Sequence, residues 1–228
     1  MKQVNRKKEF IIWLLLLLPF IYAMVVWNKT PDQVPTHFNF KGEPDDYSGK
    51  AFALLLMPFL NIVIYFVLFF IPRIDPRKKN YESFGSSYQN IRMLIHVFLL
   101  GIFLFITQTT SGGQPLQLKL FLSGMLLFFA LLGNYLRTVR SNFFVGIRTP
   151  WTLSSETVWR KTHELAGKIW FYGGIALAIA VFFLPDLPAG IVMGTGVFLM
   201  ALIPVVYSYL EFNRINHVEN DHTASHEQ

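Results

Sequence analysis

The sequence of 228 residues is too apolar for an ordinary soluble domain, because 53% of its residues are hydrophobic and only 15% are charged, whereas about a quarter of a soluble domain is charged. It contains no cysteine, which excludes a disulfide framework and thiol chemistry. The formal net charge is +6, and the positions of the basic residues decide whether this charge indicates a polyanionic partner or a membrane topology.

Six uncharged apolar runs produce this composition. Each is about 17–25 residues long, the length of helix needed to cross a hydrocarbon core about 30 Å thick. The apolar residues are continuous rather than alternating, which disfavours a lipid-facing β-barrel, and core helices of a soluble protein would need shorter runs with polar faces. The runs are Phe10–Trp27, Ala51–Pro72, Met93–Thr110, Leu120–Leu136, Ile169–Pro185 and Leu187–Leu210. The sequence therefore predicts an all-α integral membrane protein with six transmembrane helices.

The first run also has one property of a secretory signal, because Lys2, Arg6, Lys7 and Lys8 precede it. However, no clean small-x-small cleavage site follows, and the run is longer than a signal core of about 7–15 residues. We therefore expect the first helix to be retained.

The basic residues set the predicted orientation. Of the 20 Lys and Arg residues, 16 lie before the first run, in the connections Arg73–Arg92 and Arg137–Lys168, or after the last run. The connections on the other side hold the remaining four. Because basic residues accumulate on the cytoplasmic side, we predict that both termini are cytoplasmic. The charge then reflects the topology in the lipid bilayer and does not indicate direct binding of nucleic acid.

The connection Asn28–Lys50 is predicted to be a short extracytoplasmic loop, and its three prolines exclude a continuous helix. Alternating residues at Thr36–Phe40 predict a short strand, and Lys41–Pro44 predicts a turn after it. The polar side chains that could converge here are His37, Asn39, Asp45 and Asp46. One histidine and two adjacent aspartates lack the spacing of a metal site, so turn and strand-edge roles are favoured and no metal is predicted.

The other minor segments carry weaker signals. Ser111–Lys119 and Pro185–Pro188 are predicted to be plain turns. Arg73–Arg92 is polar, with a turn-prone centre at Ser83–Ser87, which favours a solvated linker. The tail Glu211–Gln228 is polar and is predicted to be disordered.

The connection Arg137–Lys168 is the most informative, since it interleaves six Arg or Lys residues and two Glu residues with four aromatic residues. Ser154 suits a helix N-cap, so we predict a short amphipathic helix over Ser154–Lys168 that lies at the cytoplasmic interface and runs into the fifth span. The charge alone is explained equally well by topology and contact with anionic head groups. The aromatic residues together with Gly146 and Pro150 favour a folded cytoplasmic loop.

Strongly polar residues inside the runs are few: Asn61, His96, Gln108 and Asn134. Hydrogen bonds between helices are the favoured explanation for them. No acidic or basic residue lies at mid-span, which argues against an ion-coupled transporter. The sequence also contains no Gly-rich phosphate loop, HExxH or GxSxG motif. We therefore predict no catalytic residue, no cofactor and no enzymatic activity.

Two segments resemble a known family. VPTHFNFKGEPDDYSGK, at Val34–Lys50, resembles the loop of a membrane domain of unknown function found in SdpI-type proteins. GNYLRTVRSNFFVGIRTPWTLSSETVWRKTH, at Gly133–His163, is similar to the signature of the SdpI family. Both occur in the family's order among six spans. The chain is thus divided into an N-terminal membrane region (1–92), an SdpI-like membrane region (93–210) and a polar tail (211–228).

The resemblance implies a multi-pass immunity and sensing protein of the bacterial cell membrane. In the family, the outer loop would face a secreted toxic peptide, and the cytoplasmic loop would face a repressor protein that is held at the membrane. The outer residues implied are His37, Asn39, Gly42, Pro44 and Asp45. The cytoplasmic residues implied, for partner binding or for structure, are Asn134, Asn142, Gly146, Arg148, Thr149, Pro150, Trp151, Trp159, Thr162 and His163.

Two alternatives stay open. A transporter or lipid-handling protein that clears amphipathic molecules would also have these spans, since the shortage of ionisable residues argues only against ion coupling. An enzyme built on the neighbourhood of His163 and Arg148 would need a nucleophile or a metal set, and no motif supplies one.

Overall fold

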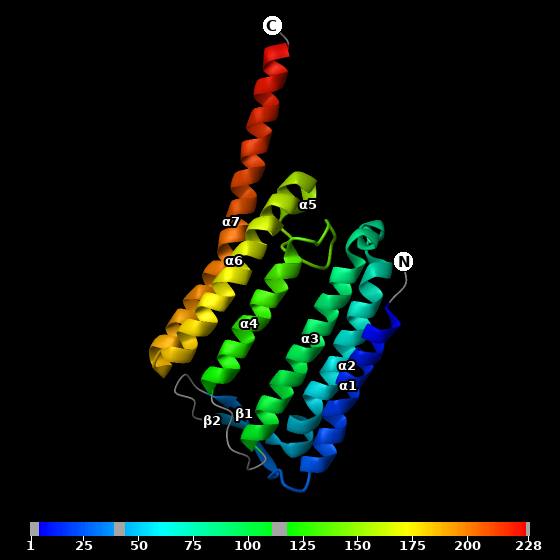
Figure 1. Ribbon diagram of the computed structural model, residues 1–228, viewed down its shortest axis with the longest axis vertical. Helices are drawn as coiled ribbons and strands as arrows, with labels where there is room; N and C mark the ends of the chain where they lie inside the picture. The colour runs from blue at the N-terminus through cyan, green and yellow to red at the C-terminus, as the bar shows by residue number, and fades with distance from the viewer. Residues whose placement is uncertain (1–4, 39–43, 111–117, 227–228) are drawn as a thin grey trace.

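The computed structural model describes residues 5–38, 44–110 and 118–226 (Figure 1). Its elements in chain order are α1 (Arg6–Val26), β1 (Gln33–Phe38), β2 (Pro44–Gly49), α2 (Lys50–Ile74), the 3-10 helix η1 (Lys78–Asn80), α3 (Tyr81–Thr110), α4 (Leu118–Leu136), α5 (Pro150–Ser154), α6 (Glu156–Phe183) and α7 (Asp186–His226). In the described part of the chain, six helices are long and apolar enough to cross a membrane. This confirms the prediction of an all-α membrane protein with six spans.

The helices form two groups of three, α1–α2–α3 and α4–α6–α7, which meet where α3 lies beside α4 (Figure 1). Stacked rings join the groups, since Phe98 lies on Phe128 and Phe105 lies on Phe121, each with ring centroids 4.0 Å apart. Beside them, apolar side chains of α3 and α4 line a cavity of about 340 Å³. Many large apolar side chains of the spans are exposed, as lipid contact requires.

Polar contacts cross the first group of helices. His96 Nδ1 of α3 lies 2.6 Å from Asn61 Oδ1 of α2, and both side chains are buried. This confirms the predicted hydrogen bonding between helices for these two residues. Near the start of α1, Glu9 pairs with the buried Arg92 at 2.5 Å and accepts a hydrogen bond from the Tyr65 hydroxyl at 3.1 Å. The group is therefore tied together by side-chain polar bonds as well as by packing.

The two ends of the bundle differ (Figure 1). The first residues of α1, the η1 connection and α5 lie at one end, from which the last turns of α7 project, and the strands lie at the other. We call these the cap end and the hairpin end. The predicted cytoplasmic segments thus share one end, and the predicted outer loop lies at the opposite one. Which end faces the cytoplasm remains a prediction from the charge distribution.

The hairpin end carries an antiparallel pair in which Gln33 faces Gly49 and Val34 faces Ser48, with the register becoming irregular after Pro35. The strand predicted over Thr36–Phe40 is confirmed as far as Phe38 and begins earlier, at Gln33, while its last two residues lie outside the described residues. Most of the predicted turn lies outside the described residues. The second strand, β2, was not predicted from the sequence. An ion pair of 2.8 Å between Asp32 and Lys50 joins the hairpin to the start of α2.

The prediction of a solvated linker over Arg73–Arg92 is wrong. Only a short stretch separates α2 from α3, and α3 begins at Tyr81. Tyr81, Phe84 and Tyr88 are all buried and their rings contact one another, with centroids 4.8–6.3 Å apart. The spacing of these residues places one aromatic face on the bundle. At the predicted turn, over Ser83–Ser87, the helix is interrupted only by a non-helical backbone conformation at Phe84.

Two further boundaries differ from the predictions. The helix that was expected over Ser154–Lys168 is the first half of α6, which is capped by Ser155 and continues without a break into the span. In the tail, α7 continues as helix to His226 where disorder was expected. Glu211 helps to hold it, because its buried carboxylate pairs with Lys161 of α6 at 2.6 Å.

Candidate functional site

The connection between α4 and α6, residues 137–155, folds back over the end of the bundle, and we call it the cap. It contacts the η1 connection, the start of α6 and the middle of α7. The prediction of a folded loop is therefore confirmed. Apart from the short helix α5, the cap contains no helix or strand, so regular backbone hydrogen bonding does not determine its path. Side chains that bond to the backbone of the cap determine its path.

Asn142 is the centre of the cap and is fully buried. Its Oδ1 accepts hydrogen bonds from the backbone N–H groups of Phe144 at 2.9 Å and Val145 at 2.6 Å. Its Nδ2 donates to the carbonyls of Arg140 at 2.8 Å and Val145 at 2.9 Å. An asparagine side chain can imitate a turn of backbone in this way. Asn142 thus folds the chain on both of its sides.

Asp75, directly after α2, is a residue of this site that was not predicted from the sequence. Its buried carboxylate accepts hydrogen bonds from the backbone N–H of Arg77 at 2.7 Å and of Phe143 at 3.0 Å. The Tyr81 hydroxyl lies 3.0 Å from Asp75 Oδ2 and 3.2 Å from Asn142 Oδ1, so its single proton serves one acceptor at a time. Asp75 therefore fixes the cap to the end of a membrane span.

Two neighbours extend this attachment. The Arg77 guanidinium donates to the carbonyl of Leu153 at 2.8 Å and to the Ser141 hydroxyl, and it lies over the ring of Phe143. Asn80 donates to the carbonyl of Ser141 at 2.6 Å. The only sequence signal for this role is Asp75 itself, a lone acidic residue in the otherwise basic stretch Arg73–Lys79.

His163 and Gly146 meet at the start of α6. His163 Nδ1 lies 2.8 Å from the carbonyl of Trp159, and Nε2 lies 2.9 Å from the backbone nitrogen of Ile147. One partner is an acceptor and the other a donor, so the ring is neutral and carries its proton on Nδ1. Gly146 has a φ of 109°, and a Cβ there would lie 2.3 Å from Nε2. The site therefore requires a glycine against a histidine whose two nitrogens are both occupied.

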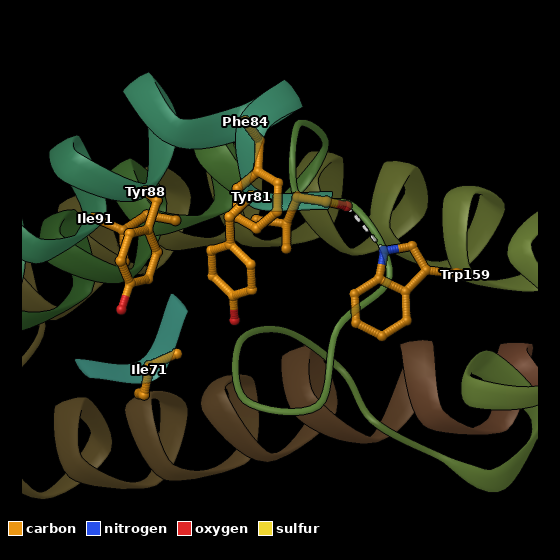
Figure 2. Packing of buried hydrophobic residues seen from close by; sticks show 7 residues of the cluster. Ile71, Tyr81, Phe84, Tyr88, Ile91 and Trp159 are labelled. Atoms are coloured by element: carbon orange, nitrogen blue, oxygen red, sulfur yellow. Dashed lines mark hydrogen bonds between the residues drawn. The ribbon is translucent and has the colours of Figure 1, made fainter. Parts of the chain in front are cut away.

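Trp159 joins the cap to the buried aromatic cluster at the start of α3 (Figure 2). Its indole N–H donates to the carbonyl of Val139 at 2.8 Å, and its ring stacks on His163 with centroids 4.1 Å apart. Figure 2 shows Tyr81 and Tyr88 of the same cluster on α3. The indole thus fixes Val139 of the cap to the start of α6.

Replacing Trp159 by phenylalanine tests this hydrogen bond. The ring volume is largely kept, but the buried carbonyl of Val139 loses its partner, so we expect the protein to lose about 1–2 kcal/mol of stability. The measurement is thermal unfolding in detergent micelles. The exposed Tyr172→Phe variant is the control and should unfold with the wild type. Equal midpoints for Trp159→Phe and the wild type would show that the bond contributes nothing.

Thr149, Pro150 and Trp151 attach the cap to α7. Thr149 caps α5 by accepting the backbone N–H of Thr152 at 3.1 Å, with Pro150 at the first helical position. The Thr149 hydroxyl also lies 3.0 Å from the hydroxyl of Ser208 on α7. The indole of Trp151 packs on Tyr209 with centroids 5.0 Å apart. These three predicted residues therefore all contribute to the contact between the cap and α7.

The remaining predicted residues of this end are dispersed. Arg148 is exposed and donates to the carbonyl of Phe143 at 2.6 Å. Thr162 is buried, and its hydroxyl has no hydrogen-bond partner among the residues that the structure describes. Asn134 is exposed on α4 and lines a small pocket with Arg137 and Lys168. It does not belong to the cap.

The predicted residues of the outer loop are less fully described. His37 belongs to β1 and is the backbone partner of Asp46, while Pro44 begins β2. Asp45 is exposed in β2. Asn39 and Gly42 lie outside the described residues. Within the described part of the chain, no group of three metal-ligating side chains occurs. Peptide binding by this loop remains a prediction.

Comparisons with known proteins match two separate segments of the chain. A family model described as "SdpI/YfhL protein family" matches residues 138–208, from the start of the cap to the α7 serine that bonds Thr149. A second model, "Domain of unknown function (DUF1648)", matches residues 14–62, which include the hairpin. A curated relative, "Immunity protein SdpI" of Bacillus subtilis (strain 168), is 25% identical over 211 residues, which covers 92% of this chain and 98% of the relative. No solved structure matches.

Proposed function

Because residues 138–208 of this chain match the SdpI/YfhL family model and residues 14–62 match the DUF1648 model, we propose that it is a multi-pass immunity protein of that family, which protects the cell against a secreted toxic peptide. The observation that carries the proposal is the match to an immunity protein along nearly the full length of both chains. A match of this extent includes the hairpin end and the cap end together.

The proposed mechanism is a shift between two packings of the bundle. A toxic peptide that binds one packing better than the other changes their populations, and a partner at the far end experiences that change. The helix α2 supports this connection, because its first residue, Lys50, pairs with Asp32 beside the hairpin, and its last residue, Ile74, directly precedes Asp75, which holds the cap. The partner at the cap would be a cytoplasmic repressor protein.

A survival assay tests the immunity proposal. A sensitive bacterium that expresses the chain is challenged with secreted peptide toxins, including any that is encoded beside the gene. We expect the wild type to grow at toxin concentrations that kill the empty-vector strain. His37→Ala and Arg148→Ala should reduce that protection, whereas Arg160→Ala, an exposed arginine on α6, should not. Immunity is refuted if the wild type protects against none of the toxins.

The orientation has a separate test, and the absence of cysteine makes it clean. A single thiol at Ser48→Cys reports on the hairpin end, and one at Ser154→Cys reports on the cap end. With a membrane-impermeant maleimide on intact cells, we expect labelling of the first variant and labelling of the second only after lysis. The reverse pattern would contradict cytoplasmic termini.

The lipid-handling alternative has one supporting observation, the apolar cavity between α3 and α4. A protein that cleared amphipathic molecules would use such a cavity as a passage. Replacing the cavity residue Gly124 by leucine fills it, since no atom lies within 4 Å of a Cβ at this position. Under the immunity proposal this variant keeps its protection. Lost protection with normal folding would favour the alternative.

A further inference from the structure

A small pocket lies between α4 and α6, near the cap end but outside the cap. It has a volume of about 150 Å³, and its lining residues are Asn134, Arg137, Gly167, Lys168, Phe171 and Tyr172. Two of the lining side chains are cationic and a third is a carboxamide. A pocket with this lining favours an anion that accepts several hydrogen bonds.

Close packing of the two helices places Arg137 at this pocket. A Cβ at Gly133 would lie 2.5 Å from Trp170 Cβ, and one at Gly167 would lie 2.4 Å from Arg137 Cγ. Glycine at both positions therefore lets α4 approach α6, and the Arg137 side chain lies against the bare backbone of Gly167. The geometry holds the stem of the arginine while its charged group stays exposed.

The charges of the pocket are incompletely neutralised. Lys168 pairs with Glu164 at 3.1 Å, but both side chains are more than half exposed, and such pairs contribute little. The Arg137 guanidinium makes no hydrogen bond or ion pair within the described part of the chain, although its charge acts on Glu164. The pocket thus keeps a net positive charge and free N–H donors in a forked, phosphate-matching geometry.

The position of the pocket indicates that the anion is a lipid head group rather than a free anion. Arg137 directly follows the last residue of α4, and Lys168 directly precedes the apolar run of α6. Tyr172 is 69% exposed one turn further along α6. Basic residues followed by an exposed aromatic residue are typical of the level of the lipid head groups, and basic pockets between spans bind anionic head groups.

We propose that this pocket binds the phosphodiester of an anionic phospholipid, with Arg137 and Lys168 on the phosphate, Asn134 as a further hydrogen-bonding group, and the Phe171 and Tyr172 rings along the start of the acyl chain. This site is independent of the immunity function. It gives the α4–α6 pair, which supports the cap, a fixed lipid at the membrane interface.

Lipid retention tests this assignment. The purified full chain is reconstituted in nanodiscs of phosphatidylcholine with a minor fraction of phosphatidylglycerol, re-extracted in mild detergent, and the retained lipids are counted by native mass spectrometry. We expect the wild type to retain phosphatidylglycerol selectively. Arg137→Gln should weaken retention about tenfold, which is the worth of one charged hydrogen-bond set. Lys168→Gln should weaken retention less, because the Lys168 ammonium already pairs with Glu164.

Arg140→Gln is the matched control, an exposed cap arginine outside the pocket, and should retain the lipid as the wild type does. Equal loss in Arg140→Gln, or no preference of the wild type for phosphatidylglycerol over phosphatidylcholine, would overturn the proposal. So would displacement of the lipid by an equal concentration of inorganic phosphate, because the site would then be one for the free anion. If Arg137→Gln does not fold, the exposed Lys168→Gln variant replaces it: weaker retention of phosphatidylglycerol than in the wild type supports the site, and unchanged retention overturns it.

Discussion

Replacing Asn142 by alanine should release the cap while the six spans stay folded. The substitution removes a fully buried carboxamide that bonds four backbone groups, and it leaves two N–H donors and two carbonyls without partners. A buried group left unsatisfied costs about 1–3 kcal/mol. These four groups are only partly buried, so the lower end applies to each, and we expect a loss of about 4 kcal/mol in the stability of the cap. The measurement is hydrogen exchange of the backbone amides of Phe144 and Val145.

The exchange of these amides should accelerate towards the rate of unstructured backbone, whereas the amides of the spans should stay protected. The exposed Asn28→Ala variant is the control and should exchange as the wild type does. If Asn142→Ala keeps the protection of Phe144 and Val145, the carboxamide does not determine the fold of the cap. A loss of protection along all six spans would show instead that the cap is needed for the bundle itself.

Replacing Gly146 by alanine should have an effect of similar size for a different reason. The backbone there has a φ of 109°, which side chains rarely adopt, and the new Cβ would lie 2.3 Å from His163 Nε2. Backbone strain and overpacking each cost about 1–3 kcal/mol, so we expect a loss of about 4 kcal/mol. The hydrogen bond from the Ile147 backbone to His163 should be lost as well.

Gly85 provides the matched comparison for this variant. A Cβ at Gly85 meets no atom within 4 Å, and the residue is helical, so Gly85→Ala should unfold at or above the wild-type temperature. Adding His163→Ala to Gly146→Ala should restore part of the loss, because the clashing ring is removed. A Gly146→Ala protein that unfolds with the wild type would contradict the close contact between Gly146 and His163.

Composition alone predicted the six spans, because a helix that crosses lipid requires a long run of apolar residues, and such runs are easily recognised in the sequence. The two helical boundaries that were wrong depend on distant partners. The start of α3 was predicted to be a linker because its packing against Trp159 is not visible in the local sequence. The tail was predicted to be disordered because the ion pair between Glu211 and Lys161 is likewise not visible there. Such contacts cannot be read from local composition.

The cap shows the same limit at the level of single residues. Asn142, Gly146, Thr149 and His163 were identified by resemblance, and the structure assigns them hydrogen-bonding and packing roles that the motif does not reveal. Asp75 was missed, since its main partner, the Phe143 backbone, is 68 positions away. β2 was missed because residues 45–48 do not alternate, and pairing with β1 rather than local propensity gives them an extended backbone.

The central claim is that a toxic peptide at the hairpin end alters the cap. Hydrogen exchange of residues 137–155 in nanodiscs tests it most directly, with a peptide against which the chain protects cells and a scrambled peptide as the control. We predict that the active peptide changes the exchange of the Phe144, Val145 and Ile147 amides by about fivefold or more, as a coupling of about 1 kcal/mol requires. Unchanged exchange with the peptide bound, in a chain that protects cells, would contradict the claim.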